Sequence, residues 1–228
     1  MTLIPCFIHS ILDFLLPDGT SQYLSFSNPP YSSLTFQKKR LISPQPKLPI
    51  KPQPEELMEI IRQASRKDIP LIQELSSEIW HQVYPTVITV DQINFMLDTM
   101  YSTTAIDNQI SQLGHSFIIL ELEGTGVGFA SYSIKHPSEP KRYRLQKLYL
   151  KPELHGRGLG KKMVRHICHE IVGLGGTALE LNVNKKNPAI LFYEHLGFYR
   201  EKEVVIDIGN GFVMDDYIMV LDLTQKPL

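Results

Sequence analysis

The stretch that decides the fold is LYLKPELHGRGLGKK, residues 148–162. It runs from an apolar, strand-like segment through a proline turn into a glycine-rich loop and the start of an amphipathic helix. Such a loop presents consecutive backbone N–H groups at the positive end of a helix dipole, which favours phosphate or another anion. Glycine at positions 156, 158 and 160 lets an anion approach the backbone and permits unusual φ values. The stretch therefore predicts an anion site after a strand, although three glycines can also form an ordinary loop.

Two well-known phosphate loops fit this stretch poorly. A Walker loop ends in Gly-Lys-Ser/Thr, whereas Gly160 is followed by two lysines and the hydroxyl that would hold magnesium is missing. A dinucleotide fingerprint needs a third glycine where Lys161 stands, although Glu180 follows about twenty residues on, at the end of a strand. A dinucleotide-binding oxidoreductase stays a weak alternative, because the predicted order contains one strand–helix–strand unit and the loop lies late in the chain.

Hydrophobic spacing predicts the other elements from residue 58 onward. A strand begins near Met58, and helices are predicted from Asp68, from Thr89, and over 105–113, 158–172 and 188–196. Strands are predicted over 116–122, 127–133, 144–150 and 177–183, with two last strands flanking residues 209–211. This order predicts an α/β (α+β) domain with a mixed sheet flanked by helices.

The first quarter of the chain differs in composition from the rest. Nine of the 16 prolines precede residue 57, whereas only nine of the 47 charged residues do. We therefore expect residues 1–57 to form a proline-rich, weakly structured extension, 58–223 the folded domain and 224–228 a short tail. Met58 is a candidate start of the native protein. The apolar stretch 3–16 lacks both a basic n-region and a small-residue cleavage site, so we do not expect a secretory signal.

The overall composition excludes several classes of function. A net charge of -1 and a pI near 6.7 disfavour a nucleic-acid binder and a polybasic membrane-surface protein. No apolar run is long enough for a membrane-spanning helix. Cys6 and Cys168 offer neither a disulfide framework nor metal-ligand spacing, which fits a cytoplasmic protein. His166, His169 and Glu170 have the spacing of a helical metal site, but a solvated helix face explains them more simply, and we expect no metal.

Two motifs in the second half of the chain resemble those of the GNAT superfamily of N-acetyltransferases. Residues 155–160, HGRGLG, are similar to the family's acetyl-CoA loop, Gln/Arg-x-x-Gly-x-Gly/Ala, with His155 at the first position. Residues 187–198, NPAILFYEHLGF, resemble the family's Asn-x-x-Ala-x-x-x-Tyr-x-x-x-Gly-Phe helix, one residue shorter between Asn and Ala. The resemblance covers residues 58–223 and is greatest to bacterial polyamine (spermidine/spermine) acetyltransferases. It implies a GNAT-like, mostly antiparallel sheet with splayed central strands.

This resemblance implies an enzyme that transfers an acetyl group from acetyl-CoA to a primary amine of a polyamine, amino acid or peptide. Tyr193 stands at the family's tyrosine position and is the implied general acid, with a buried core tyrosine as the alternative. The implied cofactor-binding residues are Leu148, Tyr149, Leu150, His155, Gly156, Arg157, Gly158, Leu159, Gly160 and Asn187. Residues 148–150 can also be interpreted as an ordinary buried strand. Asn187 can also be interpreted as a helix cap, and Asn184 is the alternative candidate for its contact with the cofactor.

No motif identifies the general base. Glu180 is the candidate because Asn182, near the position where many family members have glutamate, cannot take a proton; an ordered water is the alternative. The missing glutamate also leaves open a second class of function, a non-catalytic acyl-CoA sensor.

The acceptor pocket is predicted only from residue chemistry. Trp80 and Tyr84 could bind an amine through cation–π contacts, or they could simply pack in the core. Asp215 and Asp216 could receive a polycation, or they could lie in a solvated turn. We expect a small-molecule amine or peptide as the partner, and a dimer is one possible assembly.

Overall fold

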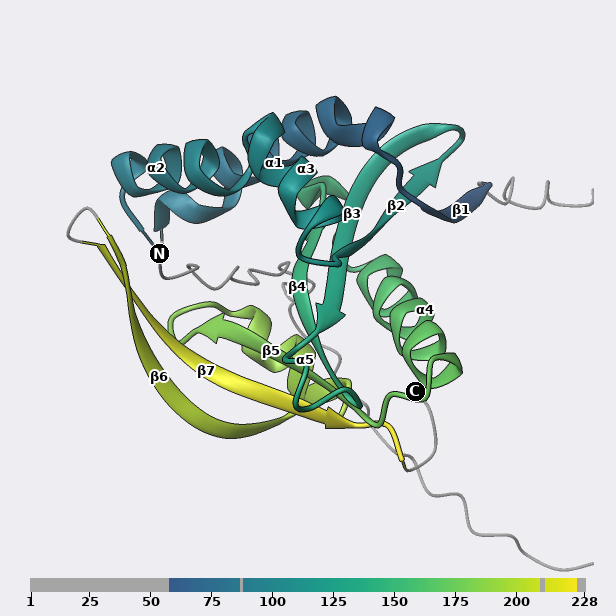
Figure 1. The fold of residues 1–228 in the computed structure, drawn as a ribbon. Coiled ribbons are helices and arrows are strands. Elements are labelled where there is room, and N and C mark those ends of the chain that lie inside the picture. Colours follow the sequence, from purple (N-terminus) through teal and green to yellow (C-terminus); the bar gives the residue numbers. More distant parts are fainter. Residues whose placement is uncertain (1–57, 87, 210–211, 225–228) are drawn as a thin grey trace, which may run out of the picture. The chain divides into compact units, whose positions relative to one another are not determined.

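The computed structural model describes residues 58–86, 88–209 and 212–224 (Figure 1). The predicted extension, residues 1–57, lies outside the described residues, as do 225–228 of the predicted tail. The helices are α1 (Ile69–Val83), α2 (Val90–Met100), α3 (Thr103–Ser111), α4 (Leu159–Gly173) and α5 (Ala189–His195). The strands are β1 (Glu59–Gln63), β2 (Ser116–Leu122), β3 (Thr125–Ile134), β4 (Arg142–Leu150), β5 (Ala178–Asn184), β6 (Tyr199–Gly209) and β7 (Phe212–Asp222). The order of elements is the one that the hydrophobic spacing predicts.

The strands form one seven-stranded sheet in the order β1-β2-β3-β4-β5-β7-β6. Every neighbouring pair is antiparallel except β4 and β5, which are parallel and are connected through α4. The predicted fold class, a mixed and mostly antiparallel sheet with flanking helices, is thereby confirmed. Among the described residues, no helix is both long and apolar enough to cross a membrane.

Helices cover the two faces of the sheet separately (Figure 1). On one face the apolar stripe of α1, including Ile72 and Leu75, packs with α2, α3 and strand residues such as Phe129. On the other face α4 and α5 pack against the apolar residues of β4 and β5, including Leu148 and Leu181. On β2 the two sets alternate, with Ile118 and Leu120 in one and Phe117 and Ile119 in the other, as the two-residue period of a strand requires.

The start of α1 differs from the sequence-based expectation. Asp68 does not cap α1 with its side chain. Its carboxylate instead accepts hydrogen bonds from the Ser65 backbone at 2.8 Å and from Arg62 at 2.7 Å, in the 3₁₀ turn that precedes the helix. These contacts, that with Arg62 foremost, lower the pKa of Asp68 to about 2. The cap at Thr89 is found, because its hydroxyl accepts from the Gln92 backbone at 3.2 Å.

Two irregularities of β4 shape the centre of the sheet. β4 pairs with β5 over only three residue pairs, from Arg142↔Ala178 to Arg144↔Glu180, and the two strands then separate. On its other side β4 contains a bulge, because Ser131 faces Lys147 whereas Tyr132 faces Leu145, so Gln146 is the extra residue. The separation gives the splayed central strands that the resemblance implies.

Candidate active site

The glycine loop joins β4 to α4 through a 3₁₀ turn, Pro152–Leu154. Gly156 and Gly158 have φ values of +75° and +76°, a region that side chains with a Cβ rarely adopt. Gly158 is the N-cap of α4, and no side chain caps this helix. The first four backbone N–H groups of an α-helix have no partner within it, so the amides of residues 158–161 have no acceptor within α4. Since residues 156–158 are exposed, a ligand can reach these amides.

Gly160 and His155 differ in their local roles from the other residues predicted for the loop. Gly160 is part of the first turn of α4 and is buried, so its backbone does not use the freedom that Gly156 and Gly158 use. The His155 ring makes a hydrogen bond through Nε2 with the Leu150 carbonyl oxygen at 3.1 Å. This contact fastens the loop to the end of β4 and directs the imidazole inward. Arg157 is exposed at the tip of the loop.

Tyr84, Tyr149, Tyr193 and Asn187 come together where β4 and β5 have separated. The Asn187 side chain hydrogen-bonds to Tyr84, and the hydroxyls of Tyr149 and Tyr193 lie near enough to Tyr84 to influence its ionisation. Burial raises the pKa of Tyr84 well above its usual value, the two neighbouring tyrosines raise it further, and the Asn187 hydrogen bond opposes them. Tyr84 therefore stays neutral. Four residues that the sequence predicts for three different tasks, namely catalysis, cofactor binding and acceptor binding, thus meet in one place.

Tyr193 lies on α5 and is completely buried. Its ring packs edge-on against Phe192 and Phe198, with centroids 5.2 and 5.3 Å away. Asn187 precedes α5, and its Oδ1 accepts a hydrogen bond from the Ala189 backbone at 2.9 Å. It therefore supports the start of α5 as well as contacting Tyr84, so the two interpretations of Asn187 are compatible. The short helix holds Tyr193 and Asn187 in a fixed relation.

The acceptor-pocket candidates lie in an aromatic cluster on the α1–α3 side of the sheet. Trp80 is fully buried, and its ring lies 4.8 Å from that of Tyr84 and 6.1 Å from that of Tyr149. Tyr101 donates a hydrogen bond from its hydroxyl to the Tyr149 hydroxyl at 3.0 Å. Trp80 thus packs against both Tyr84 and Tyr149. Of the two acceptor candidates, Tyr84 is the one that contacts Asn187.

Glu180 is separated from this cluster by its own ion pairs. Its carboxylate, 1% exposed, accepts from Arg142 Nε at 2.6 Å and from Arg144 Nε at 2.7 Å, and Lys135 lies 3.5 Å away. These contacts hold Glu180 at the end of β5 that is still paired with β4. A carboxylate bound by two guanidinium groups has its oxygens engaged in these ion pairs and hydrogen bonds. Glu180 thus binds the arginines of β4 and does not lie beside Tyr193. We therefore do not propose it as the general base.

Asp215 and Asp216 do not form a carboxylate pair. Asp215 is exposed and contacts Lys185, with Oδ1 and Nζ 2.6 Å apart, whereas Asp216 is completely buried. Successive side chains of a strand point to opposite faces, and Met219 and Leu221 place the odd-numbered positions of β7 on the α4–α5 side. Asp216 therefore lies on the same face as Met214 and the α1–α3 layer. The hypothesis that both residues line one polycation site is thereby corrected.

Lys147 is a buried residue that the sequence reasoning did not single out. It is fully buried next to the bulge in β4, with its ammonium 5.0 Å from the Tyr101 ring and 5.8 Å from the Phe117 ring. His115 lies nearby, and burial followed by the Lys147 charge lowers its pKa to about 3. The position of Lys147 beside Gln146 in the strand pattern RLQKLYL gives no hint of burial. Only the extra residue of the bulge turns Lys147 toward the helices.

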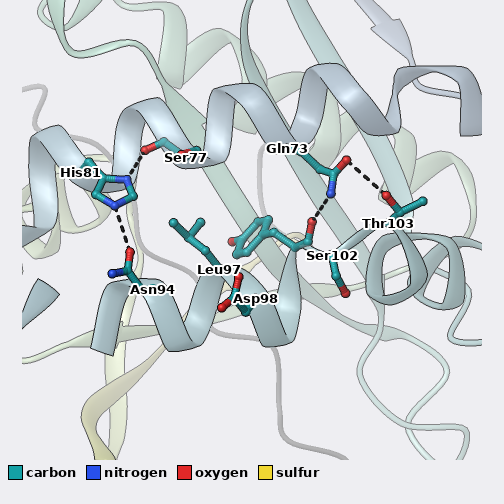
Figure 2. A pocket seen from close by; sticks show the side chains of 9 residues that line it. Gln73, Ser77, His81, Asn94, Leu97, Asp98, Ser102 and Thr103 are labelled. Atoms are coloured by element: carbon teal, nitrogen blue, oxygen red, sulfur yellow. Dashed lines mark hydrogen bonds between the residues drawn. The ribbon is translucent and has the colours of Figure 1, made fainter. Parts of the chain in front are cut away.

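A separate pocket of about 720 Å³ lies between α1 and the α2–α3 region (Figure 2). Its polar side chains bind one another: His81 contacts the Ser77 carbonyl and Asn94 Oδ1 at 2.8 and 3.1 Å, and Gln73 donates to the Tyr101 carbonyl at 3.0 Å. Figure 2 shows these pairs along the facing sides of the helices. Neither Trp80 nor Tyr84 lines this pocket, and none of the residues predicted for cofactor binding does. Tyr101 connects it to the tyrosine cluster through Tyr149.

Metal chemistry has no visible ligand set in the part of the chain that the structure describes, where no group of three His, Cys, Asp or Glu residues is arranged to hold an ion. His166 and Glu170 form a half-buried pair on α4, with nitrogen and oxygen 3.6 Å apart.

The fold and the loop together define a structural class: a mixed sheet whose two parallel central strands separate beside a glycine-capped helix. A family model, the acetyltransferase (GNAT) family, matches residues 77–198. The chain therefore belongs to the acetyltransferase (GNAT) family. Membership confirms two sequence-based predictions, an acyltransferase enzyme and acetyl-CoA as its cosubstrate.

Individual relatives agree with this assignment. The chain is 37% identical over 90 residues to the uncharacterized N-acetyltransferase YjgM of Escherichia coli, a match that spans 39% of this chain and 53% of that protein. It thus spans about half the length of that relative. It is 25% identical over 138 residues to the uncharacterized N-acetyltransferase YuaI of Bacillus subtilis, covering 60% of this chain and 78% of that protein.

A solved structure shares the fold. The PaiA N-acetyltransferase of Thermoplasma acidophilum, crystallised with coenzyme A, superposes with a TM-score of 0.61 at 24% identity, covering 72% of this chain and 99% of that one.

Proposed function

We propose that residues 58–223 form an N-acetyltransferase domain that transfers the acetyl group of acetyl-CoA to a small primary amine. One observation carries this proposal: β4 and β5 separate after three residue pairs, directly beside an α4 N-terminus capped by a glycine at positive φ. The separation exposes a strand edge to an extended ligand, and the helix start supplies donors for its phosphates. A long molecule with a charged end and a neutral arm, such as acetyl-CoA, matches both features.

The pyrophosphate of acetyl-CoA would bind at the glycine loop, residues 155–160. Gly156 and Gly158 keep the loop backbone open, because a side chain at either position would strain the φ angle and cover the amides. Arg157, exposed at the loop tip, would add a charge-assisted contact. His155 would act indirectly, by tying the loop to Leu150.

The pantetheine arm would lie along residues 148–150 of β4, on the side from which β5 has departed. Leu148 and Leu150 are buried in the core against α4, while Tyr149 faces the aromatic cluster. The backbone of β4 would therefore contact the pantetheine arm, while the side chains of β4 pack against the helices on the two faces of the sheet. A backbone N–H from this segment would polarise the acetyl carbonyl.

Tyr193 would give its hydroxyl proton to the departing thiolate. Its support by Phe192 and Phe198, and its proximity to Tyr84, favour a fixed hydroxyl position. Asn187 would contribute by holding the start of α5 and the Tyr84 hydroxyl. In this proposal Asn187 and Tyr193, both from the motif at residues 187–198, act together.

The acceptor would enter from the Tyr84 side, where Trp80 stacks behind Tyr84. Amphipathic rings suit an alkylamine through cation–π contacts of about 0.5 to 2 kcal/mol. The resemblance makes spermidine and spermine the first acceptors to test, followed by amino acids and short peptides. Since Asp215 faces away from Asp216, the proposed site holds one buried carboxylate rather than a pair, which favours recognition of one ammonium at a time.

The direct test is thiol release from acetyl-CoA with a panel of polyamines, amino acids and peptides. We expect turnover with at least one class of amine, and thermal stabilisation by coenzyme A in preference to NAD. A preference for NAD would overturn the cofactor assignment. Binding of acetyl-CoA without turnover of any amine would instead support the sensor alternative.

A further inference from the structure

Asp216 is a buried carboxylate that the proposed roles above leave without a task. It is 0% exposed, and neither carboxylate oxygen forms a hydrogen bond with a described residue. Asn184 stands directly opposite in the β5–β7 register and favours the ionised form, although hydrogen-bond geometry is not reached. A buried carboxylate without donors is costly to keep in a protein interior, which suggests a partner that arrives with the substrate.

The groups around Asp216 bring its pKa close to neutral pH. Burial, which acts first, and the neighbouring Asp215 raise the pKa of Asp216 to about 7, while Asn184 and Lys185 oppose them. β6 contributes only Val204 opposite Asp216. A carboxylate in this state can both accept and release a proton near physiological pH.

Asp216 also lies beside the end of β5 that has separated from β4. On its β5 side, the Asn184 carbonyl accepts a hydrogen bond from the Asn187 backbone at 2.9 Å, and Asn187 contacts Tyr84. On its other side, Met214, two residues back on the same face, lies 4.0 Å from the Gln92 side chain of α2. Asp216 therefore sits between the start of α2 and the Asn187–Tyr84 contact, at the end of β5 that has separated from β4.

We propose that Asp216 is the catalytic base of the acetyl transfer and the group that binds the acceptor's ammonium. This inference rests on the proposed function and supplies the one role that it leaves vacant. Glu180 lies on the same face of β5 but is held by Arg142 and Arg144, and Asn182 between it and Asn184 cannot accept a proton. Asp216 is the carboxylate that reaches this face from the next strand.

Asp216 takes one proton from the acceptor's ammonium, and the freed nitrogen lone pair forms a bond to the thioester carbon. The carbon–sulfur bond breaks, Tyr193 gives its proton to the sulfur, and the tyrosinate recovers a proton from the second N–H of the nitrogen. The products are an amide and the free thiol, and Asp216 releases its proton to solvent.

The test compares Asp216→Asn with Asp215→Asn, a matched substitution one residue away on the opposite face. For Asp216→Asn we expect kcat to fall about 10²- to 10⁴-fold, as is typical of a lost base, with acetyl-CoA affinity unchanged by calorimetry. Asp215→Asn should keep kcat within about twofold of wild type. The wild-type kcat/KM should rise with pH through an inflection near 7, and the Asp216→Asn enzyme should lose that inflection. Asp216→Glu should recover part of the rate.

Further measurements distinguish a wrong base assignment from a wrong acetyltransferase proposal. If Asp216→Asn fails to fold, Asp216→Ala assayed with added formate replaces it, and recovery of rate with formate concentration is the expected result. An active wild type whose rate and pH profile survive Asp216→Asn, or an Asp216→Ala variant that formate does not rescue, overturns the base assignment alone. A wild type that binds acetyl-CoA but acetylates no amine overturns the acetyltransferase proposal and this inference with it.

Discussion

Replacing Glu180 by Gln tests whether this residue stabilises the domain or takes part in the reaction. The change removes one negative charge from a carboxylate that is 1% exposed and is bound by Arg142 and Arg144. Breaking a buried ion pair by removing one partner costs about 3 to 5 kcal/mol. The arginine side chains are 21% and 17% exposed, and Arg142 keeps its contact with Glu201, so the loss should be near the lower end, about 3 kcal/mol.

The expected consequence is a less stable enzyme with normal chemistry. For a domain of this size a loss of about 3 kcal/mol lowers Tm by roughly 6 to 12 °C. Denaturant unfolding and the pH profile of kcat should be measured on the same preparation, at a temperature where the variant is folded. We expect a lower unfolding midpoint, with kcat and its pH dependence close to those of wild type.

Glu201→Gln is the matched control for this experiment. Glu201 also contacts Arg142, at 2.7 Å, but it is 31% exposed, and such surface pairs contribute about 0 to 1 kcal/mol. A loss of stability that came only from removing a partner of Arg142 would affect both variants equally. A Glu180→Gln enzyme with unchanged stability and a kcat reduced about a hundredfold would refute the reasoning and return Glu180 to the role of base.

Three further changes test other parts of the structure. Tyr193→Phe removes only the hydroxyl and should lower kcat about 10²- to 10⁴-fold at unchanged acetyl-CoA affinity; a fall of less than about threefold in a stable variant would make Tyr193 purely structural. Gly158→Glu should abolish coenzyme A binding in calorimetry, whereas Gly175→Glu, also at positive φ but after α4, should keep it; equal affinities would remove the loop assignment. His115, whose pKa is lowered to about 3, binds a proton below about pH 6.5 only when unfolded, so stability is lost as pH falls. His115→Gln should therefore reduce the loss of unfolding free energy between about pH 7 and pH 5 by about 2 kcal/mol; an unchanged loss would contradict the shifted pKa.

Local sequence patterns predicted most of the fold and the glycine loop before α4. The Gly156–Gly160 segment and the helix that holds Tyr193 are short, and each is defined by neighbours in the chain. Thr89 caps its helix as predicted, since a cap depends on contacts within one turn. Such features can be read without knowing which strands lie side by side.

The environment of the carboxylates could not be read in this way. Glu180 is held by Arg142 and Arg144, which lie far earlier in the chain, through the short parallel pairing of β4 and β5. Asp216 depends on the β5–β7 register, which places it opposite Asn184. Lys147 depends on a one-residue bulge. Long-range register decides each of these cases, and a single sequence carries little information about it.

The brief parallel pairing of β4 and β5 has a consequence for the motions of the domain. It divides the sheet into two antiparallel ribbons, β1–β4 and β5–β7–β6, which share three residue pairs and the Glu180 ion pairs. On one face the apolar side chains of α4 and α5 pack across both ribbons and hold them together. The junction is therefore the natural axis for twisting one ribbon against the other. Amide hydrogen exchange should then follow the two ribbons as distinct cooperative units, and a ligand lying between β4 and β5 should couple them into one.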